Sequence, residues 1–175
     1  EIRISDWSSD VCSSDLVGGL NPYAVESAAR MGAKMVWLPT REAVSSMEKA
    51  GIGNYSDRTA LHVVDGDMQP LPALLEVLEV ARDYNIPVST GHILQEESFV
   101  ACRVGLAMGV TMVLSHPEYD NTPISVAAQK QFVEMGVLIE NDWVDIALKM
   151  ATVPEVAQSI REIGAEHIYL ATDRG

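Results

Sequence analysis

Residues 86–92, Ile86-Pro87-Val88-Ser89-Thr90-Gly91-His92, form a short apolar run with β-branched residues that ends in Gly-His. Such a run is typical of a buried strand. Two later runs are built the same way: TMVLSH ends in His116, and HIYLATD ends in Asp173. Where strands alternate with helices, their carboxyl ends lie on one face of a parallel sheet or barrel, which is where such folds place their sites. We therefore predict that these three terminal side chains converge on one site.

The spacing of the apolar runs predicts an α/β fold with a parallel sheet, because successive βα units make right-handed crossovers. Residues 61–68 hold an Asp-Gly pair among apolar residues, which predicts a small hairpin. Strands are expected at residues 33–40, 86–91, 111–115, 137–140 and 167–172, and helices at 22–31, 41–50, 72–84 and 154–163, with two more that end near Gly109 and Gly136.

The composition favours one domain that acts on a small-molecule substrate. Of the 175 residues, 47% are hydrophobic, a share typical of a globular domain. The sequence has no apolar run of membrane-spanning length and no signal-peptide pattern, so we expect a cytoplasmic protein without a membrane partner. A net charge of −13 with 12 Lys and Arg residues argues against nucleic acid. Cys12 and Cys102 form neither a metal motif nor a disulfide framework. The sequence leaves open whether the chain forms a homo-oligomer.

The first sixteen residues are expected to lie outside the domain. Residues 6–16, DWSSDVCSSDL, show no hydrophobic period and resemble the translation of a sequencing-library adapter. The alternative is a disordered leader rich in Ser and Asp. In either case residues 1–16 are excluded from fold reasoning, and residues 17–175 form the domain that can be interpreted.

Other polar residues near the strand ends are secondary candidates. Glu140 and Asp142 follow a strand and could contact a metal or substrate, although acidic residues in such loops are usually solvated. Arg41 could pair with a substrate carboxylate or simply lie on the surface. His62 and His167 are assigned structural roles, since neither stands at the carboxyl end of a predicted strand.

Four segments resemble an uncharacterised family related to the amidohydrolase superfamily, whose members are metal-dependent hydrolases on a (β/α)8 TIM barrel. They are residues 17–40 (VGGLNPYAVESAARMGAKMVWLPT), 89–92 (STGH), 113–117 (VLSHP) and 170–173 (LATD). The resemblance implies a partial barrel with roughly strands three to eight, the N-terminal strands being missing, since a full barrel needs about 250 residues.

The resemblance also implies a set of metal ligands. In the superfamily a His-x-His pair comes from the first strand, single histidines come from the fifth and sixth, and an aspartate comes from the eighth. The matching positions are His92, His116 and Asp173, with Asp173 also the catalytic base. The implied cofactor is a divalent metal, Zn²⁺ with Mn²⁺ as the alternative, as one or two ions. Lys34 begins its strand, so the bridging lysine of many binuclear members is lacking.

Three functions remain open from the sequence. The first is a fragment of a hydrolase in which metal-activated water attacks an amide, ester or lactone-like bond. The second is a barrel phosphoesterase with the same ligand types, and the third is an α/β binding module without catalysis. We expect little or no activity from the chain as given, because the ligands of the first strand are absent from it.

Overall fold

The structure is a computed structural model that describes residues 19–49 and 60–173. Its centre is a five-stranded parallel sheet with the strand order β1-β2-β3-β4-β5. The predicted α/β class and parallel sheet are therefore confirmed. The segments 6–16 and 17–18 lie outside the described residues. The strands are β1 (Val36–Trp37), β2 (Val88–Ser89), β3 (Met112–Leu114), β4 (Leu138–Asp142) and β5 (Ile168–Ala171).

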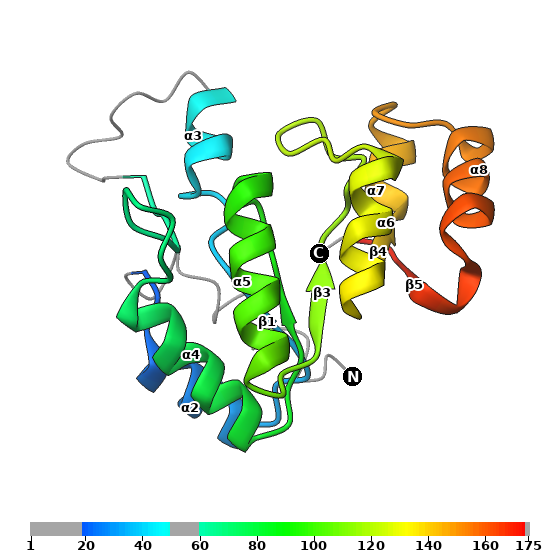
Figure 1. The fold of residues 1–175 in the computed structure, drawn as a ribbon. Helices are drawn as coiled ribbons and strands as arrows, with labels where there is room; N and C mark the ends of the chain where they lie inside the picture. The colour runs from blue at the N-terminus through cyan, green and yellow to red at the C-terminus, as the bar shows by residue number, and fades with distance from the viewer. Residues whose placement is uncertain (1–18, 50–59, 174–175) are drawn as a thin grey trace.

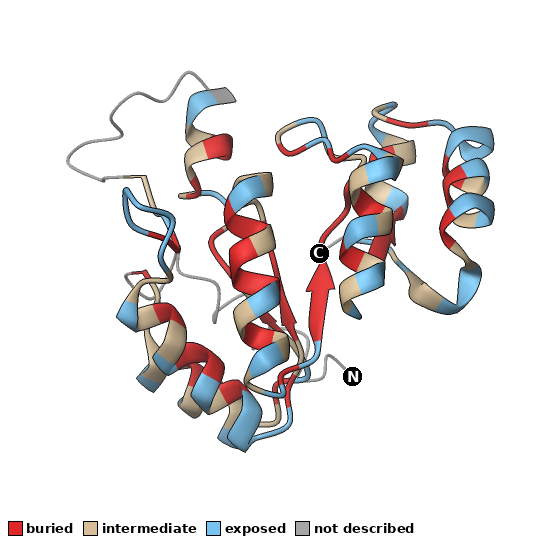
Figure 2. Ribbon diagram, viewed as in Figure 1, coloured by how far each residue is buried: buried red, intermediate tan, exposed pale blue. Residues whose placement is uncertain are grey.

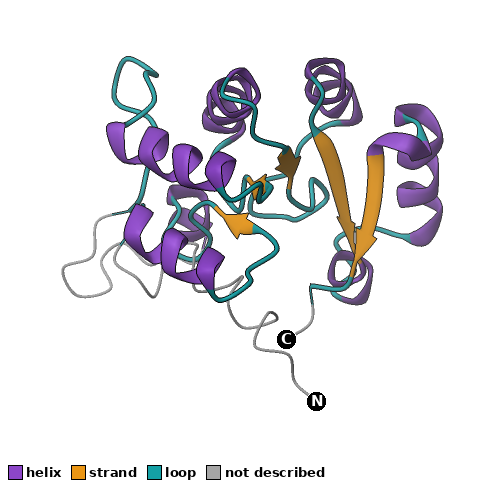
Figure 3. Cartoon of the chain, turned by 90° about the horizontal axis from the view of Figure 1, so that it is seen from below, coloured by secondary structure: helices purple, strands orange, loops and turns teal. Residues whose placement is uncertain are grey.

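Helices surround the strands (Figures 1 and 3), with α2 packed on α4 and α6 packed on α8. Within residues 19–49 and 60–173, none of these helices has both the length and the hydrophobicity needed to cross a bilayer. The helices are α2 (Pro22–Arg30), α3 (Val44–Lys49), α4 (Pro72–Asp83), α5 (Gln95–Ala107), α6 (Val126–Met135), α7 (Trp143–Ala147), α8 (Val153–Ile163) and the 3-10 helix η1 (Ala165–His167).

The strand order follows the chain without a reversal, as in a singly wound sheet. A doubly wound fold reverses its strand order and binds ligands at that switch point. In the part of the chain that the structure describes, β1 and β5 each pair on one side only. Closure of the sheet into a TIM barrel therefore stays a prediction.

Local sequence signals set the helix ends. The side chain of Asn21 accepts hydrogen bonds from the backbone N–H groups of Tyr23 (3.1 Å) and Ala24 (3.3 Å), so the predicted N-cap of α2 is confirmed. At the start of α8, Thr152 and Glu155 form a capping box. Helix α6 ends at Gly136, whose φ of 101° is readily adopted only by glycine.

The hydrophobic core lies between the sheet and its helices (Figure 2). Val88, Met112 and Ile139 point inward from three strands and are fully buried, as is Phe132 of α6. Cys102 of α5 is a free thiol in this core, and burial raises its pKa to about 12. The core therefore joins the strands to the helices that follow them, as βα units require.

Of the hairpin predicted for residues 61–68, the structure has only a tight turn closed by one antiparallel bridge, without paired strands. This stretch makes only isolated bridges, between Ala43 and Leu61 and between Val64 and Pro70. The carboxylate of Asp65 accepts hydrogen bonds from the backbone N–H groups two and four residues later, both at 2.9 Å. An Asx turn therefore satisfies backbone groups that a hairpin ladder would have used.

Candidate metal centre

Hydrogen bonds between side chains hold the carboxyl ends of β2 and β3 together. The hydroxyl groups of Ser89 and Ser115 lie 2.6 Å apart, and Ser115 Oγ accepts from the backbone N–H of Gly91 at 3.0 Å. Thr90 Oγ1 accepts from the backbone N–H of Ser115 at 3.1 Å. All of these residues are buried, so the two strand ends, and the histidines that follow them, have a defined relative position.

Gly91 allows the chain to turn closely over β1. Its φ is 59°, in the left-handed region. A Cβ at this position would overlap the carbonyl oxygen of Leu38 and would lie 2.7 Å from that of Pro39. The next residue, His92, donates its backbone N–H to the Pro39 carbonyl at 2.9 Å. Only glycine fits this turn without a shift of the backbone.

The imidazoles of His92 and His116 face each other, with their Nε2 atoms 3.1 Å apart. His92 Nδ1 lies 2.8 Å from Ser46 Oγ, which belongs to α3. The ring of Tyr119 stacks on His92 with centroids 5.1 Å apart and lies 4.8 Å from the ring of His116. The structure thus brings together the two histidines that end β2 and β3 in the sequence.

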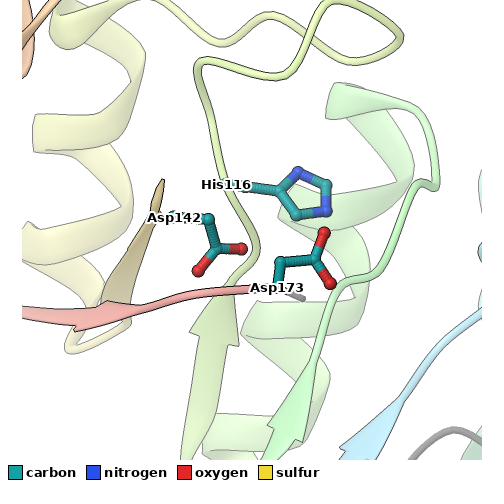
Figure 4. A group of neighbouring side chains, drawn as sticks. All are labelled: His116, Asp142 and Asp173. Carbon is teal, nitrogen blue, oxygen red and sulfur yellow. The ribbon is translucent and has the colours of Figure 1, made fainter. Parts of the chain in front are cut away.

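His116 also lies beside two carboxylates. One ligand atom of each of His116, Asp142 and Asp173 falls within 4.8 Å of the others. Figure 4 shows the Asp173 carboxylate directed at the ring of His116, with the Asp142 carboxylate to the left of the ring. His116 and Asp142 are each 5% exposed, whereas Asp173 is exposed and has a φ of 44°. Two of the three predicted site residues belong to this group, and His92 contacts it through His116.

The electrostatics of this group favour a bound cation. Burial, reinforced by the charge of His92, lowers the pKa of His116 to about 4, so its imidazole is neutral at pH 7. Burial, reinforced by the charge of Glu140, raises the pKa of Asp142 to about 8. His116 Nδ1 and Asp142 Oδ1 are buried without hydrogen-bond partners. A divalent cation bound between these side chains would offset the excess negative charge and contact the free Asp142 oxygen.

Glu140 and Asp142, the secondary candidates, are not solvated as acidic loop residues usually are. Each is 5% exposed, because β4 extends to residue 142 and continues directly into α7, which the sequence did not predict. Burial raises the pKa of Glu140, whose carboxylate accepts from Tyr169. Asp145 of α7, 1% exposed, was missed. The three-residue spacing from Asp142 was its only sequence signal, since residues i and i+3 share one helix face.

The remaining sequence candidates lie at other positions. Arg41 is exposed, and its charge acts on the Tyr119 hydroxyl. His62 Nδ1 lies 2.5 Å from Glu97 Oε1. This contact joins the 60–71 loop to the first turn of α5. His167 Nε2 lies 3.8 Å from the carboxylate of Glu166 in η1. Structural roles for the two histidines agree with these contacts.

The model of a family of unknown function (DUF6282) matches residues 8–140. The chain belongs to this family. The DUF6282 match contains His92, His116 and Glu140, and ends before Asp142 and Asp173. No curated protein matches this member of DUF6282.

Two solved structures are similar to this DUF6282 chain. Both are mutant forms of an organophosphorus hydrolase from Deinococcus radiodurans, with 14% and 15% sequence identity and a TM-score of 0.47 in each case. Each alignment covers 88% of this chain and 46% of the solved chain. The DUF6282 chain therefore spans less than half the length of these structures.

Proposed function

We propose that this chain carries part of the active site of a metal-dependent hydrolase of the amidohydrolase type. The observation that supports it is the group of His116, Asp142 and Asp173, whose ligand atoms lie within 4.8 Å at the carboxyl ends of parallel strands. Buried oxygen atoms without partners are rare in folded proteins, and Asp142 Oδ1 of this group is one of them. A cation explains both features at once.

The donor set suits Zn²⁺, with Mn²⁺ as the alternative, because it combines imidazole nitrogen with carboxylate oxygen. Two histidine nitrogens bound to one tetrahedral Zn²⁺ lie about 3.3 Å apart, given Zn–N bonds of about 2.0–2.1 Å. The Nε2 atoms of His92 and His116 lie 3.1 Å apart. The Ser46 hydroxyl can accept from His92 Nδ1, which would leave the Nε2 lone pair available to a metal.

When bound by these residues, a divalent cation would lower the pKa of a water molecule to near 7 and would polarise the scissile carbonyl. Asp173 is exposed at the end of β5 and is the group that accepts the proton of the attacking water. His116 stays neutral at pH 7 because of its burial. Tyr119 covers both imidazoles and limits their contact with bulk water.

We propose that the substrate is a small molecule with an amide, ester or lactone-like bond. We also propose a cytoplasmic location without nucleic-acid or membrane partners. The number of metal ions, one or two, is left open. Ligands from an upstream His-x-His strand belong to the longer protein that the family resemblance implies. Turnover therefore belongs to that longer protein, whereas metal binding can be measured with this chain.

The first test is metal content. After dialysis against Zn²⁺ and then against metal-free buffer, we expect the 175-residue chain to retain zinc by mass spectrometry. His116→Ala should weaken zinc binding by at least about tenfold, since it removes a ligand. His92→Ala should weaken it as well, and His167→Ala is the matched control, because it removes a partly exposed histidine outside the centre. A chain that retains no zinc, or equal retention in all variants, would favour the binding module.

A substrate panel distinguishes the two enzymes. A longer version with the upstream strand, loaded with zinc, should hydrolyse a member of a panel of esters, lactones and amides. The same version should leave phosphate esters unchanged, and Asp173→Asn should abolish the turnover while zinc is retained in part. Turnover of phosphate esters alone would establish the phosphoesterase instead.

A further inference from the structure

A second group of oxygen ligands lies beside the metal centre. Glu118 belongs to the loop after β3, Asn141 to β4 and Asp145 to α7. The Asn141 amide donates to Glu118 Oε2 at 2.7 Å, which fixes these two side chains against each other. Glu118 is also the charged group that acts most strongly on Asp145. Glu118 and Asn141 are thus in direct contact, and the charge of Glu118 acts on Asp145.

Asp145 and Asn141 are buried and each has polar atoms without hydrogen-bond partners. Asp145 is 1% exposed, and neither of its carboxylate oxygens has a hydrogen-bond partner. Asn141 is 2% exposed, and its Oδ1 also lacks a partner. A buried carboxylate without a partner costs several kcal/mol, so a native structure normally supplies a donor or a cation.

Protonation of Asp145 would remove its charge but would not supply its missing hydrogen-bond partners. Burial, reinforced by the charge of Glu118, raises the pKa of Asp145 to about 7. A protonated carboxyl would still hold a buried O–H and a buried carbonyl oxygen, and neither has a hydrogen-bond partner in the structure. The arrangement is therefore satisfied by a positive charge that contacts several oxygens.

We propose that Glu118, Asn141 and Asp145 bind a hard divalent cation, of the Mg²⁺ and Ca²⁺ class, at a second site. The donors are two carboxylates and one amide oxygen without nitrogen or sulfur, which is the ligand preference of these ions. Water completes the coordination of such ions in proteins. The site stands independently of the proposed hydrolase, because it shares none of the three ligands of the metal centre.

This cation would hold the loop that covers the metal centre. Glu118 follows His116 by two residues, and Tyr119 of the same loop stacks on His92. A cation bound to Glu118 and to two buried residues of β4 and α7 joins this loop to the sheet. Its role is therefore structural support of the loop, and the zinc ligands remain separate.

The test is calorimetric titration of the chain with CaCl₂ and with MgCl₂. We expect at least one of the two ions to bind the wild type, and His116→Ala to bind it with unchanged affinity. Asp145→Asn and Glu118→Gln should each weaken binding by at least about tenfold, because affinity for these ions depends on the number of charged ligands. Asp67→Asn, an exposed residue with the same change of charge, is the matched control.

The melting temperature and the zinc content of Asp145→Asn show whether this variant is still folded. Asp145→Asn removes an unpaired buried charge, so its melting temperature should be no lower than that of the wild type. Zinc retention by this variant would show that the metal centre is intact. No binding of either ion up to about 10 mM, roughly ten times the Kd of the weakest protein Ca²⁺ sites, would overturn the proposal. Equal loss of binding in His116→Ala would also overturn it, since the ion would then belong to the metal centre.

Discussion

At the residue scale, Gly91 determines how His92 reaches the metal centre. The backbone at this glycine has a φ of 59°, and the carbonyl oxygens of Leu38 and Pro39 lie where a Cβ would stand. Because these atoms belong to the backbone beside β1, they cannot move away as a flexible side chain can. His92 can therefore approach His116 only because residue 91 has no side chain.

We expect Gly91→Ala to lower the free energy of unfolding by about 3 kcal/mol or more, because a left-handed φ and a backbone overlap add together. Gly109→Ala is the control. Its φ is 85°, but a Cβ there would meet no atom within 4 Å. This control should cost only about 1–2 kcal/mol. Urea denaturation of the three proteins measures both values, and equal losses would contradict the overlap.

At the element scale, the direct passage from β4 into α7 concentrates acidic residues. Glu140 and Asp142 stand in the strand and Asp145 in the helix, and all three are buried. Beyond the effect of burial, the charges of Glu140 and Asp145 raise the pKa of Asp142, and the charge of Glu140 raises the pKa of Asp145. This junction therefore stores electrostatic strain, which a bound cation would relieve.

The strain predicts a pH dependence of stability in the metal-free protein. The pKa of Asp142 is raised from 3.8 to about 8 in the folded state. Its contribution to stability is therefore complete below pH 4 and is lost as the pH rises through about 8. Asp142→Asn cannot ionise, so in EDTA its melting temperature should exceed that of the wild type by roughly 5 °C more at pH 8.5 than at pH 5.

Thermal unfolding at the two pH values gives this difference, and Asp67→Asn is the control. Asp67 is exposed on the 60–71 loop, so its substitution should change the melting temperature equally at both pH values. A gap between Asp142→Asn and the wild type that narrows towards pH 8.5 would contradict the assigned direction of the shift.

At the scale of the whole molecule, the sheet has two open edges among the described residues, at β1 and at β5. Strand β5 carries Leu170, which is 70% exposed. An open edge with an exposed apolar side chain is a site for strand pairing between molecules. Association of this chain is therefore expected to involve β5 rather than the helices.

We expect the wild type to associate with increasing concentration, and Leu170→Lys to shift the population towards monomer, because a lysine on an edge strand opposes pairing. Size-exclusion chromatography with light scattering measures the mass. Met31→Lys is the control, since Met31 is 60% exposed at the end of α2, outside the sheet. Equal effects of the two substitutions would show that the edge has no special role.

Much of this fold could be predicted from local sequence. Apolar β-branched runs located β2, β3 and β5, and the Asn21 cap located the start of α2, because each signal acts within a few residues. The residues that end these runs were predicted to converge, and the structure places His92, His116 and Asp173 near one another. Topology alone supports that inference, since parallel strands present the same end on one face.

The sequence by itself thus determined the α/β class, the strand positions and the side chains that stand at the strand ends. Only the tertiary structure decided which acidic residues are buried, because burial depends on packing between distant segments. Nothing near Asp145 in the sequence signals that Glu118, 27 positions earlier, acts on it. The same holds for the contact of Ser46 with His92, which orients an imidazole through a residue 46 positions away.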